Sequence, residues 1–341
     1  LIVVLLLIGI ALPVLANDAL VLPQGVGRVY LVPVYGWQTG SWDDDGDFTE
    51  SESDDSSLET LFNLGIAGEY GLTDQISLGL QWAPGYNFLA DFDTATDTAT
   101  IRGPLPLTIG TEVGIVGSRG WVQSDAVRVQ GALGFEVPFQ PNWATQGENA
   151  ADDSKFTDPQ SFIFGVKPLF AIGGGLSFDY VVMDGFYLNL FSELRQHFSR
   201  TFDVTDFYKE TGLFVGPPLG SVAGSDLDKV EVQVDPFLEM DLEFDPNYTL
   251  SLSDTVDLGF SLPVTYSFTQ EITGTATTGI SGFPEDESDV ERPESWTVTL
   301  GPTVSTFITA LPVPLEFVGY WNWDVAGRNS SRTNQLVLES R

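Results

Sequence analysis

The 341-residue chain carries 14 lysines and arginines against 48 aspartates and glutamates, which gives a formal net charge of −34 at pH 7. So acidic a chain repels phosphate backbones, and nucleic acid is therefore excluded as a partner. The hydrophobic content of 43% excludes a disordered acidic tail, and the absence of cysteine excludes disulfides and cysteine-ligated metals.

The first segment, residues 1–16, is an apolar run that ends in small residues. Val14 and Ala16 occupy the −3 and −1 positions of a secretory cleavage site, so residues 1–16 are predicted to be a signal peptide that lacks its first few residues. A transmembrane anchor is the alternative, but the run is shorter than the roughly 20 residues that a spanning helix needs. The mature domain is expected to cover residues 17–341.

Along the mature chain, hydrophobic and polar residues alternate with a period of two, which predicts strands. In 255–269, for example, Val256, Leu258 and Phe260 alternate with Asp257 and Gly259. Twelve such segments are predicted, in chain order: 26–37, 61–70, 75–82, 107–115, 126–137, 164–182, 186–197, 229–244, 255–269, 296–308, 315–323 and 334–339, the last expected to be a truncated strand.

Short and long connections between these segments alternate. Residues 71–74, 183–185 and 312–314 are hairpin turns, whereas 38–60, 84–105, 139–161, 199–228 and 270–295 are long, polar and acidic. This asymmetry is typical of an outer-membrane β-barrel, which has short periplasmic turns and long extracellular loops. The segments are also long enough to cross hydrocarbon as tilted strands.

A soluble β-sandwich also explains the alternation, so the placement of aromatic residues is needed to distinguish a sandwich from a barrel. Aromatic side chains fall on the apolar parity at both strand ends, as expected for the two girdles of a barrel at the membrane interfaces. The predicted girdle residues are Trp37, Trp82, Trp296 and Trp323 at the loop end, and Tyr70, Tyr180, Phe186 and Phe244 at the turn end. The pattern favours the barrel.

The polar parity assigns mainly carboxylates to the lumen of this barrel. The predicted lining acids are Glu69, Glu112, Glu136, Asp179, Glu193, Glu231, Asp235, Glu239, Asp241, Glu243, Asp257 and Glu316, against the bases Arg28, Arg128, Lys167 and Arg195. Rows of carboxylates lower the energy of cations in a pore. An open pore is therefore expected to prefer cations, although any one carboxylate can instead pair with a base.

Two other features have modest interpretations. His197, the single histidine, has no recognisable nucleophile motif nearby, so a polar lining role is favoured over an enzymatic one. Asp43, Asp45 and Asp47 have the spacing of a calcium loop, but Phe48 stands where an EF-hand has glycine, so loose metal binding is only a weak candidate beside a solvated loop.

Residues 22–26, an acidic Asp-Gly loop and residues 64–80, which read LGIAGEYGLTDQISLGL, resemble the opening of outer-membrane barrels of the phenol meta-pathway degradation family. The resemblance covers mainly the first third of the chain. It implies an outer-membrane channel that passes small, often aromatic, compounds, and it carries over no catalytic residue.

We therefore expect an all-β chain that forms one transmembrane antiparallel barrel of about twelve strands in the outer membrane of a diderm bacterium. Its expected partners are the lipid bilayer and small solutes, and no cofactor is expected. Loops 84–105 and 199–228 are candidates for a constriction or a hydrophobic entry patch, formed by Phe88, Phe92, Phe202, Phe207 and Phe214. The alternative is that these aromatic side chains only pack the loops together. A non-conducting structural or adhesin barrel is the alternative function.

Overall fold

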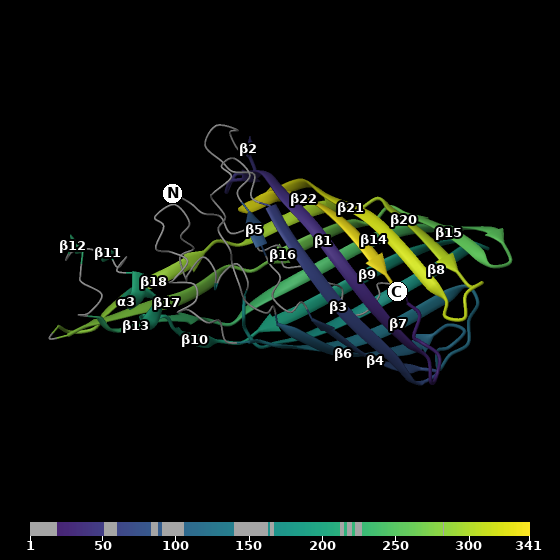
Figure 1. Cartoon of the computed structure of the whole chain (residues 1–341), viewed down its shortest axis with the longest axis horizontal. Helices are drawn as coiled ribbons and strands as arrows, with labels where there is room; N and C mark the ends of the chain where they lie inside the picture. The colour runs from purple at the N-terminus through teal and green to yellow at the C-terminus, as the bar shows by residue number, and fades with distance from the viewer. Residues whose placement is uncertain are drawn as a thin grey trace.

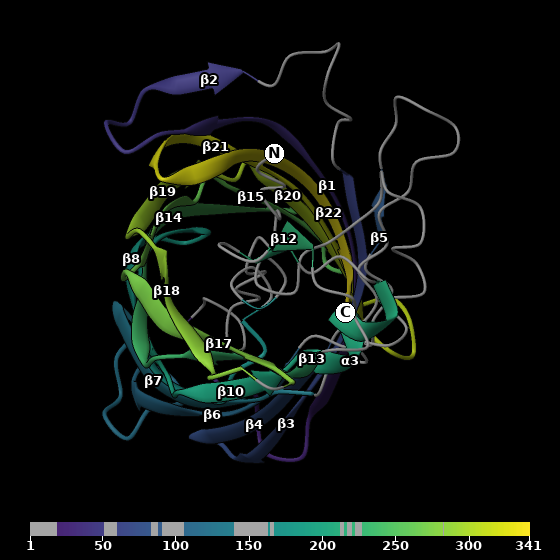
Figure 2. The same ribbon diagram turned by 90° about the vertical axis from the view of Figure 1, so that its left-hand side faces the viewer.

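The computed structural model shows a ring of antiparallel strands, seen end-on in Figure 2. It describes residues 19–50, 60–82, 88–90, 106–139, 163, 167–211, 215–216, 220–221, 227–281 and 283–341. The predicted signal peptide lies outside these residues. No helix in the described part of the chain is long and apolar enough to cross a membrane.

The barrel wall contains twelve strands in the described part of the chain (Figure 1). They are β1 (Gly27–Trp42), β3 (Thr60–Thr73), β4 (Ile76–Trp82), β6 (Leu107–Val116), β7 (Val127–Val137), β8 (Ala171–Met183), β9 (Phe186–His197), β14 (Phe237–Ser253), β15 with β16 (Val256–Ser261, Val264–Thr269), β19 with β20 (Ser295–Leu300, Thr303–Ile308), β21 (Leu315–Arg328) and β22 (Ser330–Ser340). Two short strands, β2 (Phe48–Glu50) and β5 (Phe88–Ala90), flank β1 and β3. The predicted all-β barrel is confirmed.

The last strand closes the ring onto the first. β22 pairs with β1 in the register Val34–Val337 and with β21 in the register Tyr320–Val337. Closure gives each wall strand two neighbours, so the backbone N–H and C=O groups need no water in hydrocarbon.

Two wall strands are interrupted by proline at adjacent positions. Pro263 separates β15 from β16, and Pro302 separates β19 from β20, because proline has no N–H to donate to a neighbouring strand. The Gly301 N–H donates to the Pro263 carbonyl at 3.0 Å, which carries the pairing across the break.

Most connections follow the predicted asymmetry. Residues 74–75, 184–185 and 254–255 are tight turns at one end of the barrel, and the long connections lie at the other end. Asn329 is an exception, because this single residue joins β21 to β22 at the long-loop end. Its positive φ of 48° is a conformation that asparagine tolerates better than most residues.

Four wall strands continue beyond the long-loop end as a second sheet, labelled β10, β13, β17 and β18 at the left of Figure 1. We call this unit the projecting sheet. Its strands are β10 (Arg200–Asp203), β13 (Leu227–Val234), β17 (Ile272–Ile280) and β18 (Asp286–Arg292). β10 and β17 come after β9 and β16 in the chain, β13 and β18 come before β14 and β19, and the two sheets have the same lateral order. Helix α3 (Thr205–Thr211) lies beside β13.

The projecting sheet has its own hydrophobic core. The fully buried members include Phe202, Phe207, Val232 and Phe237. At the start of α3, Asp203 accepts hydrogen bonds from the backbone N–H and the hydroxyl of Thr205, which lower the pKa of Asp203. This part of the chain is therefore an ordered extension of the barrel.

Three expectations need correction. The predicted strand 229–244 is two strands, because Pro236 falls between β13 and β14, so Glu231 and Asp235 lie in the projecting sheet and not in the barrel lumen. Phe202 and Phe207 pack in its core rather than constricting the pore. The predicted strand 164–182 begins only at Ala171. Phe92 and Phe214 lie outside the described residues, as does the side chain of Phe88.

Replacing Phe202 with alanine is expected to destabilise the projecting sheet by about 3–5 kcal/mol, because the ring is fully buried there. Hydrogen exchange should accelerate in β10 and β13 and stay unchanged in β8 and β9. The exposed neighbour Thr201, replaced by alanine, is the matched control. Equal acceleration across the barrel wall would contradict a separate core.

Candidate functional site

A network of charged side chains occupies the lumen near the long-loop end. Arg195 contacts three carboxylates: its Nε lies 3.0 Å from Glu136, its Nη2 3.2 Å from Glu193 and its Nη1 3.3 Å from Glu239. Glu239 also pairs with Lys167 and lies 2.8 Å from the Nε2 of His197. These groups are largely buried, so removing one charged partner would leave another buried charge uncompensated.

Local sequence makes room for this network. Gly173 lies beside Arg195 in the register of β8 and β9, and a Cβ there would approach Glu193 to 3.0 Å. Lys167 reaches the network from the segment before β8, with a positive φ of 50° that is unusual for lysine. His197 stacks on Phe237 with ring centroids 4.4 Å apart. The histidine is therefore a buried member of an ion network.

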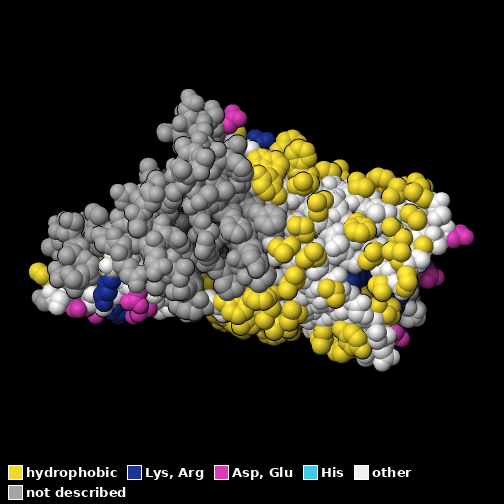
Figure 3. Space-filling model, in the orientation of Figure 1, with side chains coloured by type: hydrophobic (Ala, Val, Ile, Leu, Met, Phe, Trp, Pro, Cys, Tyr) yellow, Lys and Arg dark blue, Asp and Glu magenta, His cyan; other side chains and the backbone are white. Residues whose placement is uncertain are grey.

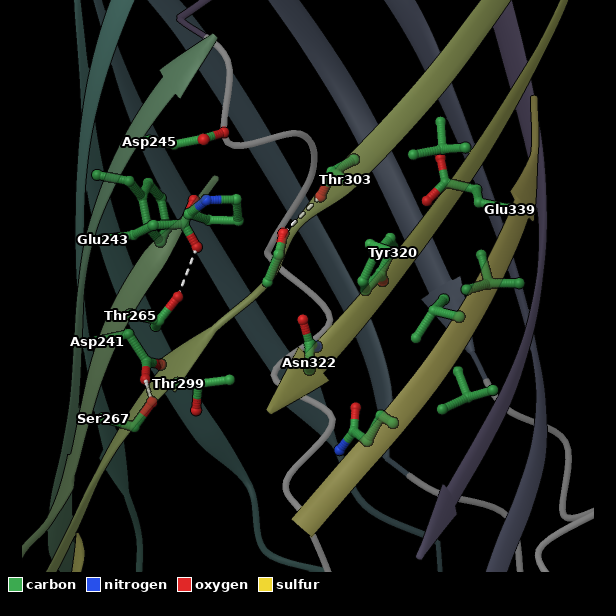
Figure 4. Close-up of a pocket in the computed structure, with 18 of the residues that line it drawn as sticks. Asp241, Glu243, Asp245, Thr265, Ser267, Thr299, Thr303, Tyr320, Asn322 and Glu339 are labelled. Atoms are coloured by element: carbon green, nitrogen blue, oxygen red, sulfur yellow. Dashed lines mark hydrogen bonds between the residues drawn. The ribbon is translucent and has the colours of Figure 1, made fainter. Parts of the chain in front are cut away.

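A row of carboxylates runs along β14 and faces hydroxyl groups on β16. Ser267 donates to Asp241 at 2.6 Å, Thr265 donates to Glu243 at 2.9 Å, and both pairs are drawn in Figure 4. Farther around the wall, Asp324 of β21 accepts from Thr299 at 2.6 Å and from the Thr333 hydroxyl at 2.5 Å. Neutral hydroxyls orient these carboxylates without cancelling their charge.

The inner face of β1 carries an apolar patch beside β21 and β22, which we call the apolar wall. Tyr30, Val32, Val34 and Val337 form a buried cluster against which Tyr320 packs. On β1 the outward parity is apolar as well, with Val29 and Leu31 exposed. Sequence reasoning missed this inner wall because both faces of the strand are hydrophobic.

Smaller polar clusters lie toward the turn end of the lumen. Arg28 reaches Glu69 at 3.8 Å, and Arg128 reaches Asp179 at 3.4 Å, which also accepts from Asn189 at 2.7 Å. Ser77 donates to Glu112 at 3.0 Å. At the end of the chain, Arg341 lies 2.7 Å from Glu316 and 3.3 Å from Glu339. Most bases of the lumen are thus engaged by acids.

These surfaces enclose a cavity of about 650 Å³ inside the barrel. In Figure 4 the carboxylates of β14 stand on one side of it and Tyr320 and Glu339 toward the other. Its lining within the described residues contains nine carboxylates and four basic side chains. The cavity therefore combines an acidic wall with an apolar one.

The predicted lumen residues fall into four positions. Those that line the cavity are Glu69, Lys167, Glu193, Arg195, Glu239 and Asp241, with Glu243 and Glu316. Those that contact the lining or pair within the inner wall are Glu112, Arg128, Glu136 and Asp179. Asp257 is on the same face of β15 as Gly259, two residues nearer the turn end. Glu231 and Asp235 belong to the projecting sheet.

Several lining residues were missed because the predicted strands ended too early. Asp245 continues the alternation of β14 one step beyond Phe244, and Asp324 directly follows Trp323. Extending the same parity by two residues would have found both. Glu339, at the end of the expected stub, and Arg341, two residues beyond it, also line the cavity.

The predicted girdle residues all lie on the outward-facing parity, and the hydrophobic side chains that cover the barrel wall are yellow in Figure 3. Tyr70, Tyr180, Phe244 and Trp323 are each more than two-fifths exposed, as lipid-facing groups would be. One position needs correction: Phe244 pairs with Leu190 in mid-strand rather than at the turn end, because β14 continues to Ser253.

The candidate calcium loop forms a turn. The Asp43 carboxylate accepts the backbone N–H groups of Asp45 at 3.0 Å and Asp47 at 2.8 Å, and Gly46 takes a positive φ of 82°. Within the described residues no group of three acidic, histidine or cysteine side chains is arranged to hold a metal. Asp43 therefore has a turn-forming role here.

Comparison with solved structures places this architecture among outer-membrane barrels. The crystal structure of an outer membrane channel from Pseudomonas putida F1 matches with a TM-score of 0.55 and 12% identity, over 95% of this chain and 97% of the other. The toluene transporters TbuX of Ralstonia pickettii (10% identity, 94% and 89% covered) and TodX of Pseudomonas putida (8%, 94% and 89%) give TM-scores of 0.40. No family model and no curated protein sequence matches. The similarity confirms the outer-membrane barrel fold that the sequence resemblance implied.

Proposed function

We propose that this chain is an outer-membrane channel through which small solutes cross by passive diffusion, with a preference for cations. The cavity of about 650 Å³ inside a closed barrel is the observation that carries the proposal. Alternating lipid-facing and lumen-facing side chains support residence in a bilayer, and the fold of the Pseudomonas channel supports the outer membrane.

The charge of the lining supports the cation preference. Nine carboxylates against four bases give the cavity a negative potential, which concentrates cations and raises the energy of anions. The apolar wall of Tyr30, Val32 and Val34 supports passage of small aromatic or hydrophobic compounds as well.

Recording from planar bilayers tests the proposal. The purified barrel, added to a bilayer between unequal KCl solutions, should give discrete current steps and a reversal potential displaced toward that of K⁺. Raising the salt should weaken the selectivity, because ions screen the lining charges. A folded barrel that remains electrically silent, or one that selects Cl⁻, would refute the proposal.

A non-conducting anchor or adhesin is the second candidate, and the projecting sheet is the feature that favours it. The edge strand β18 carries exposed acids at Asp286, Glu287 and Asp289 beyond the barrel mouth. Deleting residues 271–294 and joining the ends should abolish adhesion if this candidate holds. A channel should keep conducting after the same deletion.

A further inference from the structure

The cavity lining has an apolar part and an acidic part, and this combination restricts which solutes can bind inside it. The apolar part is the buried cluster of Tyr30, Val32, Val34 and Val337. The acidic part includes Asp241 of β14 and Asp324 of β21, both of which line the same cavity. A solute that satisfies both parts has an apolar body and a positive charge.

Hydroxyl groups hold the two aspartates of the acidic part in fixed orientations. Asp241 is held by the Ser267 hydroxyl at 2.6 Å, and Asp324 by the Thr299 and Thr333 hydroxyls. Neither aspartate forms a salt bridge among the described residues. Hydrogen bonds from neutral donors fix the carboxylate oxygens while leaving their charge for a ligand.

Three of the four bases in the lining are already paired with carboxylates. Lys167 is paired with Glu239, Arg195 contacts three carboxylates, and Arg341 is held by Glu316 and Glu339. An organic anion would have to break these pairs and approach an excess of negative charge. Aromatic acids are therefore poor candidates for this cavity.

Of the two tyrosines at the apolar cluster, Tyr320 is the one that can contact the apolar body of the solute. The Tyr30 ring already has the guanidinium groups of Arg28 and Arg341 at 5.8 Å from its centroid. Tyr320 also lines the cavity and packs against the edge of the apolar cluster. Its ring can stack on the ring of an aromatic solute.

We infer that the lumen selects small organic cations with an aromatic or apolar body, such as aryl-substituted ammonium ions, and that Asp241, Asp324 and Tyr320 determine this selectivity. The inference rests on the proposed channel function and names its solute class. A cavity of about 650 Å³ falls within the size range of sites that hold small organic ligands.

Current block in planar bilayers tests the inference with permanently charged probes. Benzyltrimethylammonium should block the K⁺ current with an apparent Kd about tenfold below that of tetramethylammonium, because only the former also contacts the apolar wall. Benzenesulfonate should neither block at these concentrations nor carry current. Equal block by the two ammonium ions, or permeation of benzenesulfonate, would overturn the inference.

Variants assign the effect to residues. Asp241→Asn with Asp324→Asn should weaken benzyltrimethylammonium block about tenfold, and Tyr320→Leu should weaken it about threefold without changing tetramethylammonium block. Asp286→Asn, which removes the same charge from the exposed projecting sheet, is the matched control. Unchanged block in both lumen variants would refute the assignment, and Tyr320→Leu provides the test if the double variant fails to fold.

A silent barrel would refute the channel but leave the site open to measurement. In that case calorimetric titration of the detergent-solubilised protein with benzyltrimethylammonium measures binding directly. Binding to the native chain that is lost in the double aspartate variant would support organic cations as the ligand class. Absence of binding to the native chain would overturn the inference.

Discussion

Replacing Arg195 with methionine is expected to lower the free energy of unfolding by about 3–5 kcal/mol, the largest stability loss of any single lumen substitution considered. The guanidinium lies within 3.3 Å of Glu136, Glu193 and Glu239, and its removal leaves several buried carboxylates with too few partners. Urea unfolding of the barrel in lipid vesicles, followed by tryptophan fluorescence, measures the change.

Arg28→Met is the matched control for this prediction. The Arg28 side chain is 34% exposed and lies 3.8 Å from Glu69, so its loss should change the unfolding free energy by less than about 1 kcal/mol. If the two variants unfold at the same denaturant concentration, the network around Glu239 does not have the structural role assigned to it.

The second large effect is expected on the outer surface. Leu190→Arg should destabilise the folded barrel in vesicles by about 2–4 kcal/mol, because the side chain is half-exposed between Phe178 and Phe244 and faces hydrocarbon. The same unfolding assay measures this loss. In detergent micelles, which have no bilayer, the loss of unfolding free energy should be smaller.

Tyr70→Arg serves as the comparison, since Tyr70 is equally exposed but lies near the turn end of β3. Arginine there can reach the headgroups, and the expected cost falls to about 0–1 kcal/mol. A Leu190→Arg barrel as stable as the Tyr70→Arg barrel would mean that this surface does not face lipid.

Much of the fold could be predicted because each wall strand has a hydrophobic outer face and a polar inner one. Strands such as β9 begin and end within one residue of the prediction for this reason. The segment 229–244 failed because its parity continues unbroken through Pro236 from β13 into β14. Only its length was informative, because the segment 229–244 is longer than the roughly 9–11 residues that a tilted strand needs to cross the membrane.

The site was predictable only in part. Alternation identified Asp241 and Glu239 as inward-facing, because their strand neighbours on the other parity are apolar. It could not find the apolar wall, because Tyr30 and Val32 alternate with Val29 and Leu31 and either set could face lipid. Pairing of β1 with β22 decides between them, and such long-range pairing is not visible in one strand.

Labelling of single introduced cysteines along β14 distinguishes side chains that face the lumen from those that face lipid, and the chain has no native cysteine that could react instead. In current-carrying barrels, a charged, water-soluble thiol reagent should alter conductance at positions 241, 243 and 245 and leave it unchanged at 240, 242 and 244. That period-two pattern is what a lumen lined by the carboxylate parity predicts. Modification at the even positions, or equally at all six, would contradict the account.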